Sequence, residues 1–391
     1  MIKELSAVSE EKLLSRNLAL SQQKIDLPLL WLVILMTAFS LLMIYSASVP
    51  FAEHENGSSW FYLRNQLVFL FVAIGAGGVA FSLGMAKWQK WAYFLMYVAL
   101  ALLGLVLAVG RNINGATRWI DLGPVNFQPT EFFKLIVIMY LANFIVRRQH
   151  QLDNLRIMMS VGILIGVGFG AIMWQPDFGS FVVSSVIVLG MLFLAALPTK
   201  WFIVLLLSSA AVMTLAIVFE PYRVARVAGF LDPWADPNGK GHQLSHALMA
   251  IARGDWFGVG IGASIDKRYF LSEAHTDFIF AVIGEEFGFL GLCVLVFCYG
   301  WLVWRAFSIA QIANELNLKF NALVAQGIGI WIGIQSFFNL GVNVGILPTK
   351  GLTLPFISYG GSSVVMMMIC IGLLLRVDYE NRNLVQGRKR R

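Results

Sequence analysis

The feature that most constrains this chain is a series of apolar runs of about 20 residues that are almost free of charge. A helix of that length spans the roughly 30 Å hydrocarbon core of a bilayer, where the protein must satisfy its own backbone polar groups. Only 13% of the 391 residues are charged, against about 25% in soluble domains. We therefore predict an all-α polytopic membrane protein with ten transmembrane helices. Their approximate bounds are 28–49, 66–85, 91–109, 131–147, 157–174, 178–197, 201–219, 277–304, 321–346 and 360–377.

The distribution of Lys and Arg predicts the orientation of these spans. With the N-terminus inside, 18 of the 29 basic residues lie in inner segments and five in short outer segments. Basic residues are enriched in short cytoplasmic segments, so both termini are predicted to be cytoplasmic. The expected organisation is a cytoplasmic tail (1–26), a ten-helix membrane domain (27–377) and a basic cytoplasmic tail (378–391). A large periplasmic loop at 220–276 separates helices 7 and 8.

The stretch 271–286, LSEAHTDFIFAVIGEE, is the strongest indication of function in the chain. It runs from a polar loop into an apolar helix, with Thr276 as the expected N-cap and Asp277 in the first turn. Glu285 and Glu286 follow within the same predicted span. Acidic residues inside a membrane are costly and suggest function by default. The alternatives are a helix-capping role for Asp277 and a buried ion pair for Glu285 or Glu286.

A second candidate region runs from residue 111 to residue 134. Thr130 precedes an apolar run as a candidate N-cap, and Glu131 and Lys134 lie one helical turn apart. One interpretation is an intrahelical ion pair between them. The other is that Arg118 and Lys134 present positive charge to an anionic lipid headgroup at the outer surface.

Three further features lie in or near outer segments. Asp177 follows Pro176 in a turn and is expected to cap the sixth span. Three amides fall four residues apart on the ninth span: Gln335, Asn339 and Asn343. They indicate either interhelical hydrogen bonds or the lining of a polar cavity. Lys350 is the one charge in a Pro- and Gly-rich connection, where it either reaches the surface or binds a phosphate.

The sequence does not predict a metal site. The three cysteines lie in apolar runs, as expected for small buried residues. His242 and His246 are four residues apart on a predicted amphipathic helix, but no third ligand has a matching spacing.

Several long motifs, in this order, resemble the SEDS family, the shape, elongation, division and sporulation proteins of bacterial cell-wall synthesis. They are NGATRW (114–119), QPTEFFK (128–134), GFLDPW (229–234), EAHTDFIFAVIGEE (273–286) and LPTKGLTLPFISYGGSS (347–363). The resemblance extends from the first predicted span to the last. The segment 349–353 is more similar to the division branch of the family than to the elongation branch.

The resemblance implies a peptidoglycan glycosyltransferase that polymerises lipid II at the outer face of the plasma membrane during septal synthesis. The essential acid of the family's AHTDF motif falls on Asp277. The other conserved positions of the family, which are candidates for substrate binding, fall on Arg118, Glu131, Lys134, Glu273 and Lys350. The chain departs from the family at Ser272, where proline is common, and at Thr130, where serine is common.

The implied reaction is an inverting hexosyl transfer. Asp277 would remove the proton from the 4-hydroxyl of the acceptor N-acetylglucosamine, whose oxygen attacks the anomeric carbon of the donor N-acetylmuramic acid. Undecaprenyl diphosphate would leave, with Arg118, Lys134 and Lys350 stabilising its charge. No cofactor is predicted, although a divalent cation could share that role.

The resemblance also implies partners at the division septum. They are a class B penicillin-binding transpeptidase of the FtsI type and the divisome proteins FtsQ, FtsL and FtsB. A competing function is a lipid II flippase, for which Glu285, Glu286 and the ninth-span amides would form a polar path. Two further functions stay open at this point, an elongation-type polymerase and a scaffold that recruits the transpeptidase.

Overall fold

The computed structural model describes residues 25–113, 116–121, 126–151, 154–237, 239, 241–267, 271 and 273–389. The ten predicted spans coincide with α2 (Leu27–Asn56), α3 (Phe61–Ser82), α4 (Met85–Val109), α5 (Pro129–Arg148), α6 (Leu155–Trp174), α7 (Phe178–Leu194), α8 (Thr199–Val218), α11 (Ile279–Glu315), α12 (Lys319–Asn343) and α13 (Gly361–Lys389). Within these ranges nine helices are long and apolar enough to cross a membrane, and α7 is a shorter apolar helix of 17 residues. The prediction of an all-α polytopic membrane protein is confirmed. The predicted N-terminal tail lies almost entirely outside the described residues.

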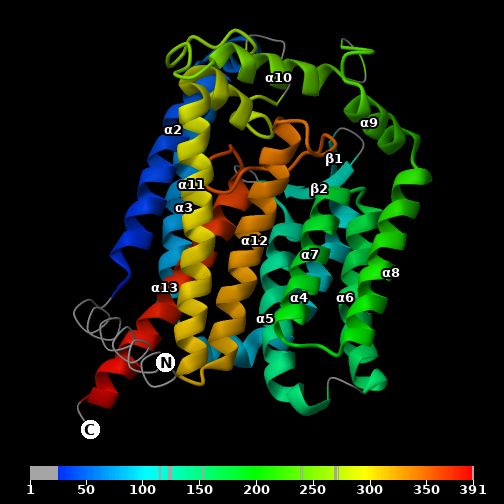
Figure 1. Ribbon diagram of the computed structural model, residues 1–391, viewed down its shortest axis with the longest axis vertical. Helices are drawn as coiled ribbons and strands as arrows, with labels where there is room; N and C mark the ends of the chain where they lie inside the picture. The colour runs from blue at the N-terminus through cyan, green and yellow to red at the C-terminus, as the bar shows by residue number, and fades with distance from the viewer. Residues whose placement is uncertain are drawn as a thin grey trace, which may run out of the picture.

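Burial differs sharply between the helices of the bundle. In its most apolar window α5 is 89% buried, whereas α8 is not buried at all. Figure 1 shows α8 at one side of the bundle, and α5 lies among its neighbours. A uniformly apolar helix with no buried face is stable only where lipid covers it, so α8 belongs at the periphery of the bundle.

One end of the bundle carries the structure that the hydropathy pattern does not describe, and we call it the outer end. Here lie two amphipathic helices, α9 (Pro221–Leu231) and α10 (His242–Gly254), within the large loop that follows α8. A small antiparallel sheet is formed by β1 (Arg111–Ile113), β2 (Ala116–Asp121) and β3 (Asn126–Phe127), in that order. The start of α2 and the end of α13 lie at the opposite end, where the 3-10 turn η1 (Gln149–Gln151) follows α5 (Figure 1).

Helix α11 is interrupted near the outer end, and the loop after α10 fills the interruption. Gly288 has a left-handed backbone (φ 68°), and there is no room for a Cβ atom at this position against Gly258. The amides of Val259 and Gly260 donate to the carbonyls of Glu285 and Glu286. In return, the amides of residues 289 and 290 donate to the carbonyls of residues 255 and 256. The loop thereby satisfies helix backbone that would otherwise be left without partners in a membrane.

Candidate active site

A polar cavity of about 900 Å³ lies at the outer end of the bundle. Its wall is built from β2, the starts of α5 and α7, helix α9, and the loops before α11 and α13. Segments far apart in the chain therefore meet around one space. The cavity is lined by five of the six predicted site residues: Arg118, Glu131, Glu273, Asp277 and Lys350.

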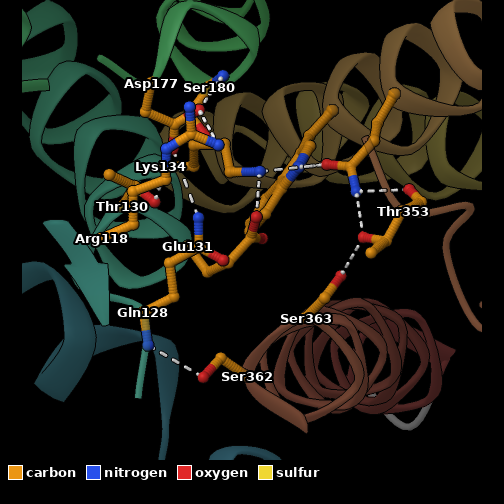
Figure 2. A network of polar contacts seen from close by, with 12 residues as sticks. Arg118, Gln128, Thr130, Glu131, Lys134, Asp177, Ser180, Thr353, Ser362 and Ser363 are labelled. Atoms are coloured by element: carbon orange, nitrogen blue, oxygen red, sulfur yellow. Dashed lines mark hydrogen bonds and ion pairs between the residues drawn. The ribbon is translucent and has the colours of Figure 1, made fainter. Parts of the chain in front are cut away.

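Asp177 connects the starts of α5 and α7 on one wall of the cavity (Figure 2). Its Oδ1 accepts a hydrogen bond from the Ser180 amide (3.2 Å), so the prediction that Asp177 caps the sixth span is confirmed. Its Oδ2 accepts from Gln128 Nε2 (3.3 Å) and from Thr130 Oγ1 (3.5 Å). Arg118 Nη1 lies 4.0 Å from Asp177 Oδ1. Asp177 therefore combines the capping role with a position on the cavity wall.

The start of α5 differs from the prediction. The helix begins at Pro129, whose fixed φ suits the first helical position, and Gln128 is the N-cap. The prediction that Thr130 caps this helix is therefore wrong. Thr130 lies in the first turn and donates to the carboxylate of Asp177 instead.

Lys134 is the one predicted site residue that does not line the cavity. Its side chain is fully buried, and its Nζ lies 2.7 Å from Glu131 Oε1 and 3.1 Å from Gln335 Oε1. The Trp331 ring lies below the same amine, with its centre 4.9 Å away. The alternative of an intrahelical ion pair is thus realised, in a buried setting (Figure 2).

Glu131 is the link between that buried pair and the cavity. One carboxylate oxygen accepts from Lys134, and the other, Oε2, has no hydrogen-bond partner among the described residues. An unpartnered buried carboxylate oxygen is costly unless a ligand group donates to it. Glu131 is therefore well placed to accept from a hydroxyl or amide of a bound molecule.

Asp277 lies on the cavity wall just before α11. That helix begins at Ile279 with Phe278 as the N-cap, so Asp277 precedes the first turn. The prediction of Thr276 as the N-cap is wrong, because its hydroxyl donates to the Glu273 carboxylate (2.9 Å). Burial and the like charge of Glu273 raise the pKa of Asp277 to about 7, against a smaller opposing effect of two arginines. A carboxyl group with such a pKa suits a general base near neutral pH.

Lys350 lies in the loop between α12 and α13, where it is partly exposed and lines the cavity. Its Nζ lies 3.2 Å from the centre of the Phe178 ring. Burial lowers the pKa of Lys350 to about 6, and the cationic groups of three neighbouring arginines act in the same direction. Asp177 opposes this change. An anion bound in the cavity would favour the charged amine.

Two arginines of α9 belong to the cavity wall, although the sequence analysis assigned them no role. Arg223 donates to the Ala216 carbonyl (2.6 Å) and lies 5.3 Å from the Phe178 ring centre. Arg226 donates to the Thr349 carbonyl (3.2 Å). Arg223 and Arg226 are three residues apart, and residues with that spacing share one face of a helix. This spacing was a sequence signal that both arginines could contact the same site.

Glu285 and Glu286 do not line the cavity and form ion pairs, as one of the alternatives expected. Glu285 Oε1 is 2.8 Å from Arg253 Nη1, and Glu286 Oε1 is 2.7 Å from Lys267 Nζ. Ser264 also donates to Glu285 (2.5 Å). Both acids therefore bind the large loop to α11.

Among the described residues, no three His, Cys, Asp or Glu side chains are close enough together to hold a metal ion. His246 instead contacts Asp266 through Nδ1 (3.1 Å).

The cavity therefore combines a candidate base, an unpartnered carboxylate oxygen, three arginines, and Lys350, whose amine a bound anion would favour in its charged form. These are the groups expected for proton removal next to a leaving anion. The family described as "Cell cycle protein", which comprises FtsW, RodA and SpoVE, matches residues 27–383 of this chain.

Similar proteins in several bacteria carry the same name, "Probable peptidoglycan glycosyltransferase FtsW". The one from Neisseria gonorrhoeae (strain NCCP11945) is 54% identical over an alignment 414 residues long. The alignment covers 96% of this chain and 89% of that protein. The one from Aromatoleum aromaticum is 45% identical and covers 94% of this chain and 91% of that protein.

Solved structures share the fold. One is described as "Structural coordination of polymerization and crosslinking by a peptidoglycan synthase complex". It has a TM-score of 0.73 and 32% identity, and covers 91% of this chain and 98% of the other. The rod shape determining protein RodA of Thermus thermophilus has a TM-score of 0.68 and 28% identity, and covers 91% of this chain and 97% of the other.

Proposed function

We infer that this chain, which belongs to the FtsW, RodA and SpoVE family of cell cycle proteins, is a peptidoglycan glycosyltransferase of septal cell-wall synthesis. Its substrate is lipid II, the disaccharide-pentapeptide carried on undecaprenyl diphosphate. The observation that carries the assignment of roles is the position of Asp277. It is a carboxyl group on the wall of a polar cavity, with a pKa raised to about 7 and no ion pair among the described residues.

A lipid-linked substrate also fits the surroundings of the cavity. An apolar pocket of about 960 Å³ lies between α6, α7, α8 and α9. Glu220 and Arg223 line both this pocket and the polar cavity, so the two spaces meet at the start of α9. A prenyl chain in the apolar pocket would therefore place its diphosphate beside Arg223 and its sugars in the polar cavity.

The roles of the side chains follow from this placement. Asp277 takes the proton of the acceptor 4-hydroxyl, the oxygen forms a bond to the donor anomeric carbon with inversion, and the bond to the diphosphate breaks. Arg118, Lys350 and the two arginines of α9 stabilise the charge on the leaving diphosphate. Glu131 and Glu273 accept from hydroxyl or amide groups of the sugars.

Lys134 contributes indirectly. Its amine is already bound to Glu131 and Gln335 inside the protein. We assign it the role of holding the Glu131 carboxylate toward the cavity. It therefore joins the substrate-binding set through Glu131, not through direct contact with the diphosphate.

The protein acts at the division septum with both termini in the cytoplasm. Its partners are an FtsI-type transpeptidase and the proteins FtsQ, FtsL and FtsB. A flippase role finds less support. Among the described residues, Glu285 and Glu286 form ion pairs with the large loop and leave no row of unpaired acids through the bundle.

The test is polymerisation of purified lipid II by the protein with its transpeptidase partner, comparing the native chain with Asp277→Asn. Asparagine keeps the shape but cannot act as a base, so we expect a loss of about 10²- to 10⁴-fold. Asp255→Asn is the matched control, because Asp255 is exposed and does not line the cavity.

Equal polymer from the native chain and Asp277→Asn would remove Asp277 as the base. No polymer from the native pair, together with transfer of lipid II across liposome bilayers, would favour the flippase instead.

A further inference from the structure

A stripe of three amide side chains runs down the face of α12 that is turned to the active site. Gln335, Asn339 and Asn343 are four residues apart, which places them on one face over about 12 Å of helix. All three are buried, with at most 1% of their surface exposed. Gln335 and Asn343 form the interhelical hydrogen bonds that were one of the two alternatives, with Lys134 of α5 and Ala281 of α11. The stripe also donates to the backbone of the two loops that carry Asp277 and Lys350.

The outer part of the stripe holds the Asp277 segment. The carbonyl of Asp277 accepts hydrogen bonds from Asn339 Nδ2 (2.9 Å) and Asn343 Nδ2 (3.0 Å). The Oδ1 of Asn343 accepts from the amide of Ala281 (3.2 Å), in the first turn of α11. Since α11 has no side-chain cap of its own, Asn343 supplies that cap from another helix.

The same stripe holds the Lys350 loop. Asn339 Nδ2 also donates to the carbonyl of Leu352 (2.6 Å), and Gln335 Nε2 donates to the carbonyl of Thr353 (2.9 Å). Gln335 Oε1 accepts from Lys134, which is paired with Glu131. The stripe therefore contacts three segments that supply predicted site residues: α5, the Asp277 segment and the Lys350 loop.

Asn339 occupies the central place, because one amide group bonds a carbonyl from each loop. The two loops also approach each other closely at Gly351, because a Cβ atom added there would lie 2.9 Å from Asp277 Oδ2. Hence the position of the Leu352 carbonyl determines how closely the loop backbone approaches the Asp277 carboxylate.

We propose that Asn339, assisted by Asn343, is a positioning residue that fixes the Asp277 carboxylate relative to the Lys350 loop. The inference rests on the proposed role of Asp277 as the base. Asn339 does not touch the substrate; it sets the place of the residue that does. A displacement of the order of 1 Å in such a group lowers a reaction rate by as much as about 10²-fold.

The experiment compares Asn339→Ala and Asn339→Asp in lipid II polymerisation, measuring kcat, KM and the pH dependence of the rate. Asn339→Asp keeps the shape but removes the donating amide. Asn321→Ala is the matched control: Asn321 is a buried asparagine on the same helix, and it bonds Glu380 at the other end of the bundle.

We expect kcat of both Asn339 variants to fall about 10- to 100-fold while KM changes little. The acid limb of the pH profile of Asn339→Ala should move to lower pH, because a loosened loop exposes the Asp277 carboxyl and lowers its pKa. The charged groups that act on this carboxyl, Glu273, Arg226 and Arg118, are unchanged in Asn339→Ala. Asn339→Asp adds a carboxyl group of its own beside the Asp277 segment, so only its kcat and KM are compared. Asn321→Ala should retain the native rate and profile.

Native kcat in folded Asn339→Asp, or native kcat with an unmoved acid limb in folded Asn339→Ala, would overturn the proposal. An equal loss in Asn339→Ala and Asn321→Ala would overturn it too, since it would indicate general destabilisation. If Asn339→Ala does not fold, Asn343→Ala provides the measurement, because it removes one of the two bonds to the Asp277 carbonyl. Asp277→Asn is assayed in parallel: native activity there contradicts the proposed base itself, whereas its loss with native Asn339 variants contradicts only the positioning role.

Discussion

Asp277 and the pair Glu285 and Glu286 come from one stretch of sixteen residues, yet the structure uses them in opposite ways. Glu285 and Glu286 are buried against Arg253 and Lys267 of the large loop. Asp277 lies on the cavity wall without an ion pair among the described residues, and its backbone is held by asparagines instead.

The difference separates two uses of a buried acid. A paired carboxylate is stabilised as an anion and fastens one segment to another, but it has no reason to take up a proton. A carboxyl group buried beside a like charge has a raised pKa and can exchange a proton near neutral pH. Position in the sequence does not distinguish these cases; the surrounding segments do.

The largest effect that tests this comparison is on stability. Lys267→Met leaves the Glu286 carboxylate buried without its cation. We therefore expect the free energy of unfolding to fall by about 3–5 kcal/mol. Asp277→Asn removes an unpaired buried acid and should leave stability unchanged or higher. Thermal unfolding in detergent measures both. The double variant Lys267→Met/Glu286→Gln should regain most of the loss; if it does not, packing of the lysine chain and not its charge is responsible.

The next effect is on the rate. Gly351→Ala adds a Cβ atom 2.9 Å from Asp277 Oδ2, so either the loop or the carboxylate must move. We expect kcat for lipid II polymerisation to fall about 10- to 100-fold. Gly387→Ala is the control, because nothing lies within 4 Å of an added Cβ there. A native rate in Gly351→Ala would mean that the close approach has no part in catalysis.

A smaller effect concerns pH. The base must be deprotonated, so activity is lost as the pH falls through the pKa of Asp277, about 7. Glu273→Gln removes a like charge that raises this pKa, and the acid limb of kcat/KM should therefore move to lower pH. An unchanged limb would contradict electrostatic coupling between the two acids.

The smallest expected effect has the opposite sign. Arg226 lowers the pKa of Asp277, so Arg226→Gln should move the acid limb to higher pH by a fraction of a unit. The acid limb of the native chain should therefore lie between that of Glu273→Gln, at lower pH, and that of Arg226→Gln, at higher pH. Shifts of the same sign in both variants would point to a general disturbance of the cavity.

Hydropathy was sufficient to locate the ten apolar helices, nine of which are long enough among the described residues to cross a membrane, because crossing a bilayer is a property of each segment by itself. Local chemistry also identified Asp177 as a helix cap. It failed at Thr130 and Thr276, whose hydroxyls bond Asp177 and Glu273 instead of capping their own helices. A cap depends on the backbone path into the helix, which single residue types do not specify.

Arg223 and Arg226 show a different kind of limit. Their spacing of three residues indicates a shared helix face, but it does not say what that face contacts. The contacts of α9 with Phe178 and with the Lys350 loop place both arginines on the cavity wall. The resemblance to a family selected Asp277 and five other residues as site candidates. It could not separate Lys134, which is buried, from the five that line the cavity.

The amino-acid sequence alone was enough to predict a polytopic helical membrane protein and to select 271–286 as the candidate acidic stretch. Both conclusions rest on costs that act residue by residue: leaving backbone groups unpaired in lipid, and placing charge there. Which acid is paired and which faces the cavity was decided only by the tertiary structure. Arg253, Lys267 and Asn339 reach their partners from 32, 19 and 62 residues away, and such pairings arise only when the folded chain brings those segments together.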